Sequence, residues 1–253
     1  MDKPLTAVRD YAQIIQATID GKKPLVVGGQ AVNIWALNYE RQIAADLAPY
    51  HPFMSKDIDL YGSIDLLDAL HRQFGGAKKV PPHRTGTVMV GFLDVELNGQ
   101  LRHVEVLWSV RGLNRKDLAE SYPVTIDNLS AEVLAPHKLL KAKISNAAGI
   151  DQDGRNDLKH VRMMVHCHRC FLREFVQLSE DGKMRDRLAV NLLEETRDII
   201  NSREAQKLTQ KWPIDLSQVW PRELLAQTQS PRIQRFVQYR LAPQSAVDGK
   251  ITP

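Results

Sequence analysis

A tight hairpin signal in the middle of the chain places the strongest limit on its fold. Two runs rich in strand-forming residues, 87–97 and 101–108, flank the dipeptide Asn98-Gly99. Asn and Gly tolerate the positive φ angles of a two-residue type I′ turn, and strands joined by such a turn are antiparallel. The sequence therefore predicts a long antiparallel pair of strands near the centre of the first half.

Strand and helix signals alternate on both sides of this hairpin. Short strands are predicted at 25–27, 57–60 and 124–126, and helical spacing of apolar residues occurs at 5–20, 31–37 and 64–74. From residue 131 onward the signals are helical, with long periodic runs at 131–148, 157–178 and 186–203. We expect an α+β fold: a mixed sheet with flanking helices in a domain over 1–128, and a helical domain over 129–253.

The composition is that of an ordinary globular protein. Apolar residues make up 43% and charged residues 25% of the 253 residues, and no apolar run is long enough to cross a membrane. The N-terminus lacks the basic and apolar segments of a signal peptide, and two cysteines provide no disulfide framework. We therefore expect a cytoplasmic protein without a membrane partner. The formal charge of +4 is compatible with a polyanionic partner but is not diagnostic of one.

A glycine pair follows the first predicted strand. Gly28 and Gly29 stand between that strand and a helical segment. Glycines here allow a phosphate group to approach the backbone, and the free amides at a helix start favour an anion. The alternative is a pair that only turns the chain. If the first interpretation holds, these glycines bind the phosphates of a nucleotide.

Two acids, Asp57 and Asp59, alternate with apolar residues on the next short strand. Side chains two apart on a strand lie on one face, with their Cα atoms roughly 7 Å apart. Ile58 and Leu60 then point into the core. Because two neighbouring carboxylates repel each other, a divalent cation that accepts hard oxygen ligands would stabilise them. The pair therefore predicts a site for Mg²⁺ or Mn²⁺, with a solvated strand face as the alternative.

A third acid, Glu105, stands in the middle of an apolar strand on the return limb of the hairpin. If this limb lies beside the strand of Asp57 and Asp59, Glu105 supplies a third metal ligand. Three acids around two metal ions are suited to in-line attack on a phosphate. Glu96 is a competing candidate on the outgoing limb, and Asp94 is a weaker one.

The order of these features resembles the nucleotidyltransferase superfamily: a glycine pair after a strand, an acid-hydrophobe-acid strand, and a third acid on a later strand. The resemblance covers roughly residues 24–108 and implies a nucleotidyltransferase fold with a nucleoside triphosphate as substrate. One departure is the 28-position gap between Gly29 and Asp57, which makes 41–55 an inserted segment. Another is Gln30, which replaces the small or hydroxyl residue often found after the glycines.

The helical half looks like the AbiEii branch of that superfamily, the bacterial toxins of abortive-infection and toxin–antitoxin systems. The residues that carry this resemblance are 133–143 and 154–160. It implies that Lys143 neutralises triphosphate charge and that Asp157 orients it or the acceptor. Lys141 and Lys138 are alternatives to Lys143. His160 stands where the family often has a second acid.

A cysteine pair offers a different kind of site. Cys167 and Cys170, with His166 and His168 beside them, have the spacing of half a zinc knuckle. No second cysteine pair exists, and both cysteines fall on one apolar face of a predicted helix. Burial as free thiols is the interpretation we favour.

The resemblance implies transfer of a nucleoside monophosphate from an NTP to an acceptor hydroxyl, on RNA (a tRNA end, for example) or on a protein, by a toxin-type enzyme with an antitoxin partner. Asp57, Asp59 and Glu105 would ligate the metal ions, Gly28, Gly29 and Lys143 would bind phosphates, and Asp157 would complete the catalytic set. The alternatives are adenylylation of a small molecule such as an antibiotic, and a binding module that has lost catalysis.

Overall fold

The computed structural model describes residues 5–82 and 86–241. The chain forms two compact units, Met1–Met164 and Val165–Pro253. They divide inside a long helix, α6 (Asp157–Glu180), and not at the 128/129 boundary drawn from the sequence. Helix α5 (Pro136–Gly149) therefore belongs to the first unit, where it packs against α2 (Gly28–Tyr39).

The first unit is built on a seven-stranded mixed sheet. Its strand order is β5-β6-β7-β4-β2-β9-β8. The bounds are β2 (Leu25–Val27), β4 (Ile58–Tyr61), β5 (Ala77–Lys79), β6 (Met89–Leu97), β7 (Gln100–Leu107), β8 (Ser121–Ile126) and β9 (Leu129–Leu134). The β4–β7 and β2–β9 pairs are parallel, and the other neighbours are antiparallel. The predicted mixed sheet is confirmed.

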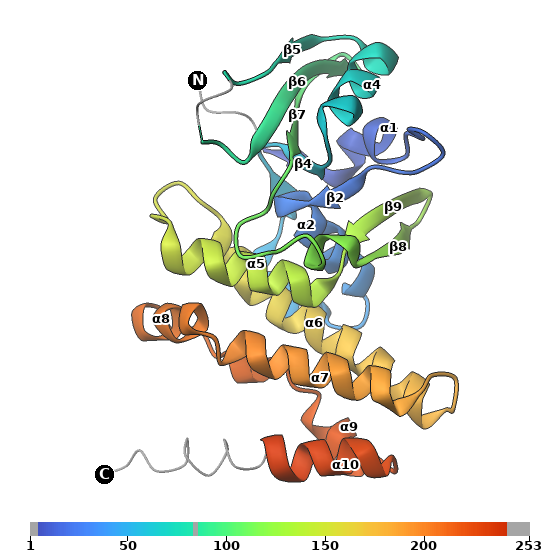
Figure 1. The fold of residues 1–253 in the computed structure, drawn as a ribbon, viewed down its shortest axis with the longest axis vertical. Coiled ribbons are helices and arrows are strands. Elements are labelled where there is room, and N and C mark those ends of the chain that lie inside the picture. Colours follow the sequence, from blue (N-terminus) through green and yellow to red (C-terminus); the bar gives the residue numbers. More distant parts are fainter. Residues whose placement is uncertain (1–4, 83–85, 242–253) are drawn as a thin grey trace. The chain divides into compact units, whose positions relative to one another are not determined.

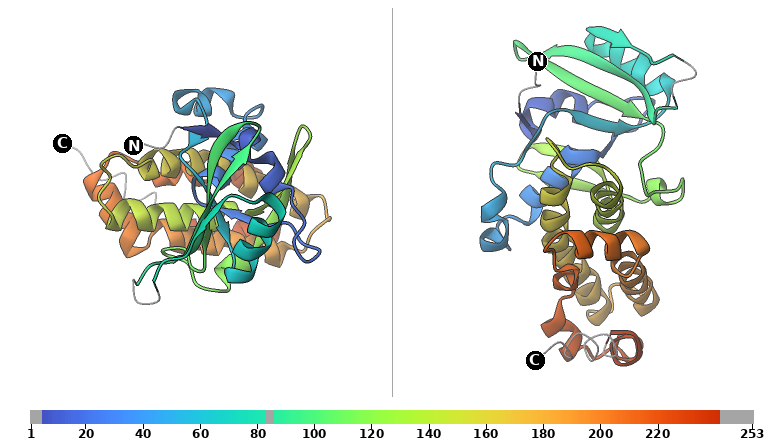
Figure 2. Two further views of the ribbon diagram at one scale, coloured as in Figure 1. Left: turned by 90° about the horizontal axis from the view of Figure 1, so that it is seen from above. Right: turned by 90° about the vertical axis from the view of Figure 1, so that its left-hand side faces the viewer.

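The predicted hairpin is also confirmed. Strands β6 and β7 pair from Leu97 and Gln100 back to Met89 and Leu107, and Figure 2 shows them as a long twisted ribbon. Asn98 and Gly99 between them have φ angles of 53° and 73°. Positive φ at both turn residues is the type I′ geometry that matches the right-handed twist of a strand pair.

Helices cover this sheet. Helix α4 (Ile64–Phe74) packs against β6 and β7, as Figure 1 shows, and α2 packs against β2, β4 and β9. Ser63 caps α4 by accepting the amide of Asp65, and its buried face carries Leu67 and Leu70. Helix α4 has the bounds that apolar spacing predicts, and α2 extends the predicted 31–37 segment in both directions, to Gly28 and Tyr39.

Two helix predictions in the first unit are wrong in part. Residues 5–20 form a strand β1 (Thr6–Ala7), a 3₁₀ turn (Val8–Tyr11) and the single turn α1 (Ala12–Ile15), because the backbone of β1 pairs with β3 (Met54–Ser55). Residues 131–134 belong to β9 and not to a helix, since β9 fills the sheet between β2 and β8. Helix α5 begins only at Pro136, a favoured first helical residue.

The segment 41–55, expected as an insertion, contains little regular structure. It holds the short helix α3 (Ala44–Leu47), a 3₁₀ turn (Ala48–Tyr50) and strand β3. Leu47 and Phe53 are buried, so the segment is anchored in the first unit.

The second unit is helical, as expected. It contains the remainder of α6, then α7 (Asp186–Ile200), α8 (Arg203–Lys211), α9 (Arg222–Gln227), α10 (Pro231–Phe236) and a π-helical turn (Val237–Leu241). The predicted helix 186–203 ends earlier, because Ser202 caps a new helix by accepting the amide of Ala205. No helix among the described residues is long and apolar enough to span a membrane.

The cysteines lie in this unit. Cys167 and Cys170 are both buried in α6 and have free thiols. Burial raises the pKa of Cys167 far above its ordinary value, so that its thiol keeps its proton. A zinc ligand must be a thiolate, and this environment favours the buried-thiol interpretation.

Candidate active site

Strand pairing brings two of the three predicted acids side by side. Strand β7 lies parallel to β4, and in this register Asp59 is the partner of Glu105. On the other edge of β4, Asp59 faces Val27, the residue before the glycine pair. Asp57 lies just before the first residue of β4. The three central strands β7, β4 and β2 therefore bring the glycines and the acids together.

The charges of these acids act on one another. The pKa of Asp59 is raised from its ordinary 3.8 to about 7, first by burial and then by the negative charges of Asp57 and Glu105. Lys143 and the amide of Gly29 act in the opposite direction but do not offset these effects. A protein gains nothing in stability from such a cluster, whereas a divalent cation would stabilise it. The donor set of carboxylate oxygens fits Mg²⁺ or Mn²⁺.

The structure separates the three candidates for a third acid. Glu96 is exposed and lies opposite Leu101, four residues before Glu105 along β7. Asp94 lies opposite His103, and the ring of His103 contacts both Asp94 and Glu105. Only Glu105 is the direct strand partner of Asp59.

Close contacts with Asp59, Ser55 and His160 leave room only for glycine at both positions of the pair. Gly28 has a φ of 68°, and a Cβ atom there would collide with the carboxylate of Asp59. The amide of Gly29, in the first turn of α2, donates to that same carboxylate. A Cβ at Gly29 would collide with the hydroxyl of Ser55 and crowd the ring of His160. The pair thus admits Asp59 to the start of α2, where amides and the helix dipole favour an anion.

The lysine and the aspartate of the helical segments form a buried ion pair. Lys143 Nζ lies 3.1 Å from Asp157 Oδ1, and the two side chains are 9% and 3% exposed. Arg155 Nε donates to the other oxygen of Asp157 at 2.8 Å. Burial alone would raise the pKa of Asp157, but the charge of Lys143 and the hydrogen bonds from both basic groups lower it. Lys143 also acts on the charge of Asp59, which places it near the acids.

The two alternative lysines have different partners. Lys138 Nζ lies 3.1 Å from Asp117 and 3.3 Å from Glu120, and Lys141 Nζ lies 2.9 Å from Asp117. Lys143, by contrast, lowers the pKa of Asp59 through its positive charge.

Ser55 and His160 also lie at the site, although the sequence predicts no site role for Ser55 and no defined role for His160. His160 is 3% exposed, and among residues 5–82 and 86–241 neither ring nitrogen has a hydrogen-bond partner. Burial, followed by the charge of Lys143, lowers its pKa well below the usual value, so its ring is neutral. No periodic signal in the sequence would have placed these two residues against Gly29.

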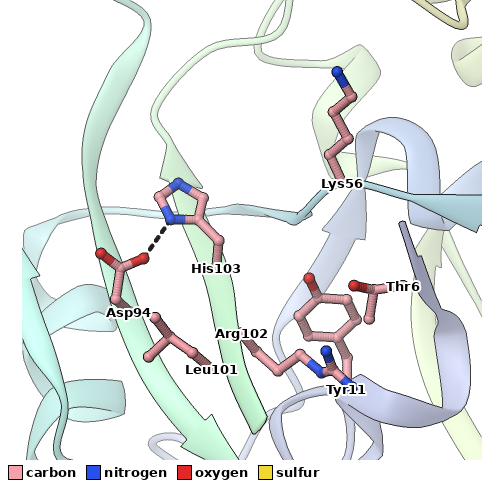
Figure 3. A pocket seen from close by; sticks show the side chains of 7 residues that line it. All are labelled: Thr6, Tyr11, Lys56, Asp94, Leu101, Arg102 and His103. Atoms are coloured by element: carbon pink, nitrogen blue, oxygen red, sulfur yellow. Dashed lines mark hydrogen bonds and ion pairs between the residues drawn. The ribbon is translucent and has the colours of Figure 1, made fainter. Parts of the chain in front are cut away.

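A small cavity lies beside His103. It has a volume of about 110 Å³ and is lined by Thr6, Tyr11, Lys56, Asp94, Leu101, Arg102 and His103. Figure 3 shows the Asp94 carboxylate directed at the ring of His103, while Tyr11 and Thr6 lie side by side on the opposite wall. Three of its lining residues, Leu101, Arg102 and His103, belong to β7, the strand that carries Glu105.

Comparisons with known proteins give distant likeness only. No protein-family model matches the chain, and no curated protein matches it. Among solved structures, an antigenic nucleotidyltransferase-like protein from Paracoccidioides brasiliensis is 16% identical, with a TM-score of 0.36. The alignment covers 90% of this chain and 97% of that one. The functional assignment therefore depends on the residues of this chain.

Proposed function

We propose that the protein is a metal-dependent nucleotidyltransferase that moves a nucleoside monophosphate from an NTP to an acceptor hydroxyl. The observation that carries this proposal is the pairing of Asp59 with Glu105 on parallel strands, with Asp57 just before β4. Burial, followed by the negative charges of Asp57 and Glu105, raises the pKa of Asp59 to about 7, and such a cluster of carboxylates is a site that favours bound cations.

In the proposed reaction the acceptor oxygen forms a bond to the α-phosphorus, and the bond from that phosphorus to the β-phosphate oxygen breaks. Pyrophosphate leaves, and the hydroxyl proton passes to a base or to solvent. Bound divalent ions would supply Lewis acidity at the reacting phosphate. Asp57, Asp59 and Glu105 would hold these ions.

The remaining site residues would bind the triphosphate. We assign the β- and γ-phosphates to the start of α2 at Gly28 and Gly29, whose amides and dipole favour anions. Lys143 would add a positive charge, and Asp157 holds its ammonium group at 3.1 Å. Arg155 also pairs with Asp157, so two basic groups face one carboxylate. This group of three residues has a net positive charge near the acids.

The acceptor and the biological role are assigned from resemblance. The likeness of 133–143 and 154–160 to AbiEii-type toxins supports an RNA acceptor, such as a tRNA end, or a protein hydroxyl, with an antitoxin partner in the cytoplasm. The excess of 34 Lys and Arg over 30 Asp and Glu is compatible with RNA.

Label transfer tests the proposal directly. The full chain is incubated with each α-labelled NTP, Mg²⁺ or Mn²⁺, and either total RNA or total protein, beside Asp57→Asn and the surface control Glu96→Gln. We expect the wild type and Glu96→Gln to label one class of acceptor and Asp57→Asn to lose at least about 100-fold in rate. Equal labelling by wild type and Asp57→Asn would refute the assignment.

A further inference from the structure

His103 lies between two carboxylates on the face of the sheet that carries the acids. Its Nδ1 is 2.6 Å from Asp94 Oδ1, and its Nε2 is 3.1 Å from Glu105 Oε1. Asp94 is the cross-strand partner of His103, and Glu105 is two residues further along the same strand. Figure 3 shows the first of these contacts at the wall of the cavity.

The ring is held in place by more than these two contacts. Phe92, the cross-strand partner of Glu105, packs against His103 with ring centroids 4.7 Å apart. The His103 side chain is 13% exposed and that of Glu105 is 17% exposed. Each of these contacts is a hydrogen bond between one ring nitrogen and one carboxyl oxygen, and the tautomer of the ring sets which of the two donates. The ring therefore links Asp94 to Glu105.

A metal-binding carboxylate needs its orientation fixed, because a loose side chain loses conformational entropy when it binds. The structure shows such a hydrogen-bonded support for Asp59, which accepts the amide of Gly29, and for Glu105, which is hydrogen-bonded to His103. The contact between His103 and Glu105 lies within strand β7 of the β6–β7 hairpin.

We propose that His103, anchored by Asp94, is a positioning residue that orients Glu105 for binding a divalent cation. This inference rests on the proposed function, because it assumes that Glu105 is a metal ligand. It gives Asp94 a role different from the direct ligand role considered from the sequence: Asp94 acts on Glu105 through the ring.

The test is calorimetric titration of the full chain with Mn²⁺ alone, without any turnover. His103→Phe removes both contacts while keeping a ring against Phe92, and Asp94→Asn weakens the anchor. His103→Gln retains a nitrogen near the position of Nε2. Glu96→Gln is the matched control, an exposed acid on the same strand two residues from Asp94. Thermal unfolding of each variant reports on folding separately.

We expect His103→Phe and Asp94→Asn to weaken Mn²⁺ binding about 10- to 100-fold, the usual effect of losing a partner of a metal ligand. His103→Gln should recover part of that loss, and Glu96→Gln should bind like the wild type. The direction of the change in Mn²⁺ affinity is informative, because a ring that acted only as a nearby positive charge would repel the cation. In that case His103→Phe would bind Mn²⁺ more tightly than the wild type.

The outcomes separate the two proposals. If the wild type binds no Mn²⁺, the proposed metal site itself is wrong. If the wild type binds Mn²⁺ and His103→Phe binds it equally or more tightly, the positioning role is wrong and the metal site stands. A lower unfolding temperature with unchanged Mn²⁺ affinity would likewise show that the pair only stabilises the hairpin.

Discussion

Replacing Asp59 by asparagine should stabilise the metal-free protein at neutral and alkaline pH. Asparagine has nearly the same shape and keeps an oxygen for the amide of Gly29, but it removes the negative charge that Asp57 and Glu105 oppose. An active-site substitution that abolishes activity and raises stability is the signature of a strained charge cluster.

The magnitude follows from the pKa of Asp59. The difference between about 7 in the folded protein and the ordinary 3.8, at 1.36 kcal/mol per pH unit, corresponds to about 4 kcal/mol. The coupling of Asp59 to the other two acids reduces this figure, and we expect about 2 kcal/mol. For a unit of this size, that is an increase of about 4–8 °C in the unfolding temperature.

The sign depends on pH. Between about pH 3.8 and pH 7 the folded protein retains a proton at Asp59 that the unfolded chain has released. The stability of the wild type therefore falls as pH rises through this window, whereas Asp59→Asn is spared this loss. The advantage of the variant should be small near pH 4 and complete above pH 7.

The assay is urea unfolding of both proteins in EDTA at pH 4.5 and pH 8, with Glu96→Gln as an exposed-acid control. Excess Mg²⁺ should then stabilise the wild type at pH 8 and have a smaller effect on Asp59→Asn. The reasoning is refuted if Asp59→Asn is no more stable than the wild type at pH 8, or if its advantage is the same at both pH values.

Three further predictions concern neighbouring features. Gly21→Ala should lower the free energy of unfolding in urea by about 1–2 kcal/mol, because Gly21 has a positive φ. Gly28→Ala should lower it more, because Gly28 also has a positive φ and its new Cβ would collide with Asp59. Only Gly28→Ala should also weaken Mn²⁺ binding, since its Cβ meets the aspartate of β4 whereas Gly21 has nothing within 4 Å; equal Mn²⁺ affinity would contradict this. Lys143→Met should lower the free energy of unfolding by about 3 kcal/mol, because it leaves Asp157 with one basic partner. Lys143→Arg keeps the charge and should lower the free energy of unfolding clearly less. Equal losses in the two variants would show that charge is irrelevant at this position. Burial alone would raise the pKa of Asp117, but a backbone amide and two lysines of α5 lower it to about 2. The ionised Asp117 therefore contributes about 2 kcal/mol to the free energy of unfolding above pH 3.8, and this contribution should disappear as pH falls toward 2. Asp117→Asn should be less stable than the wild type at pH 7 and equally stable near pH 2. A loss of stability that persists at pH 2 would contradict the charge argument.

Several elements could be predicted from local sequence. The Asn98-Gly99 turn, helix α4 and the alternation at Asp59 each depend on residues within a few positions of one another. Turn chemistry and side-chain periodicity operate at this range, and tertiary contacts in the structure agree with them. The same reasoning failed for β9, where residues with helical spacing became a strand because the sheet had an open position between β2 and β8.

The sequence by itself determined the hairpin, the acid-bearing strand and the succession of helices, because these depend on short-range spacing. Only the tertiary structure decided that β7 lies beside β4, so that Glu105 and not Glu96 faces Asp59. It also decided that Lys143 forms an ion pair with Asp157 and that the ring of His160 lies close to Gly29. The contacts of His103 with Asp94 and Glu105 likewise depend on the tertiary structure. The physical reason is that strand order and register are fixed by burial of the whole sheet, which no local pattern of residues records.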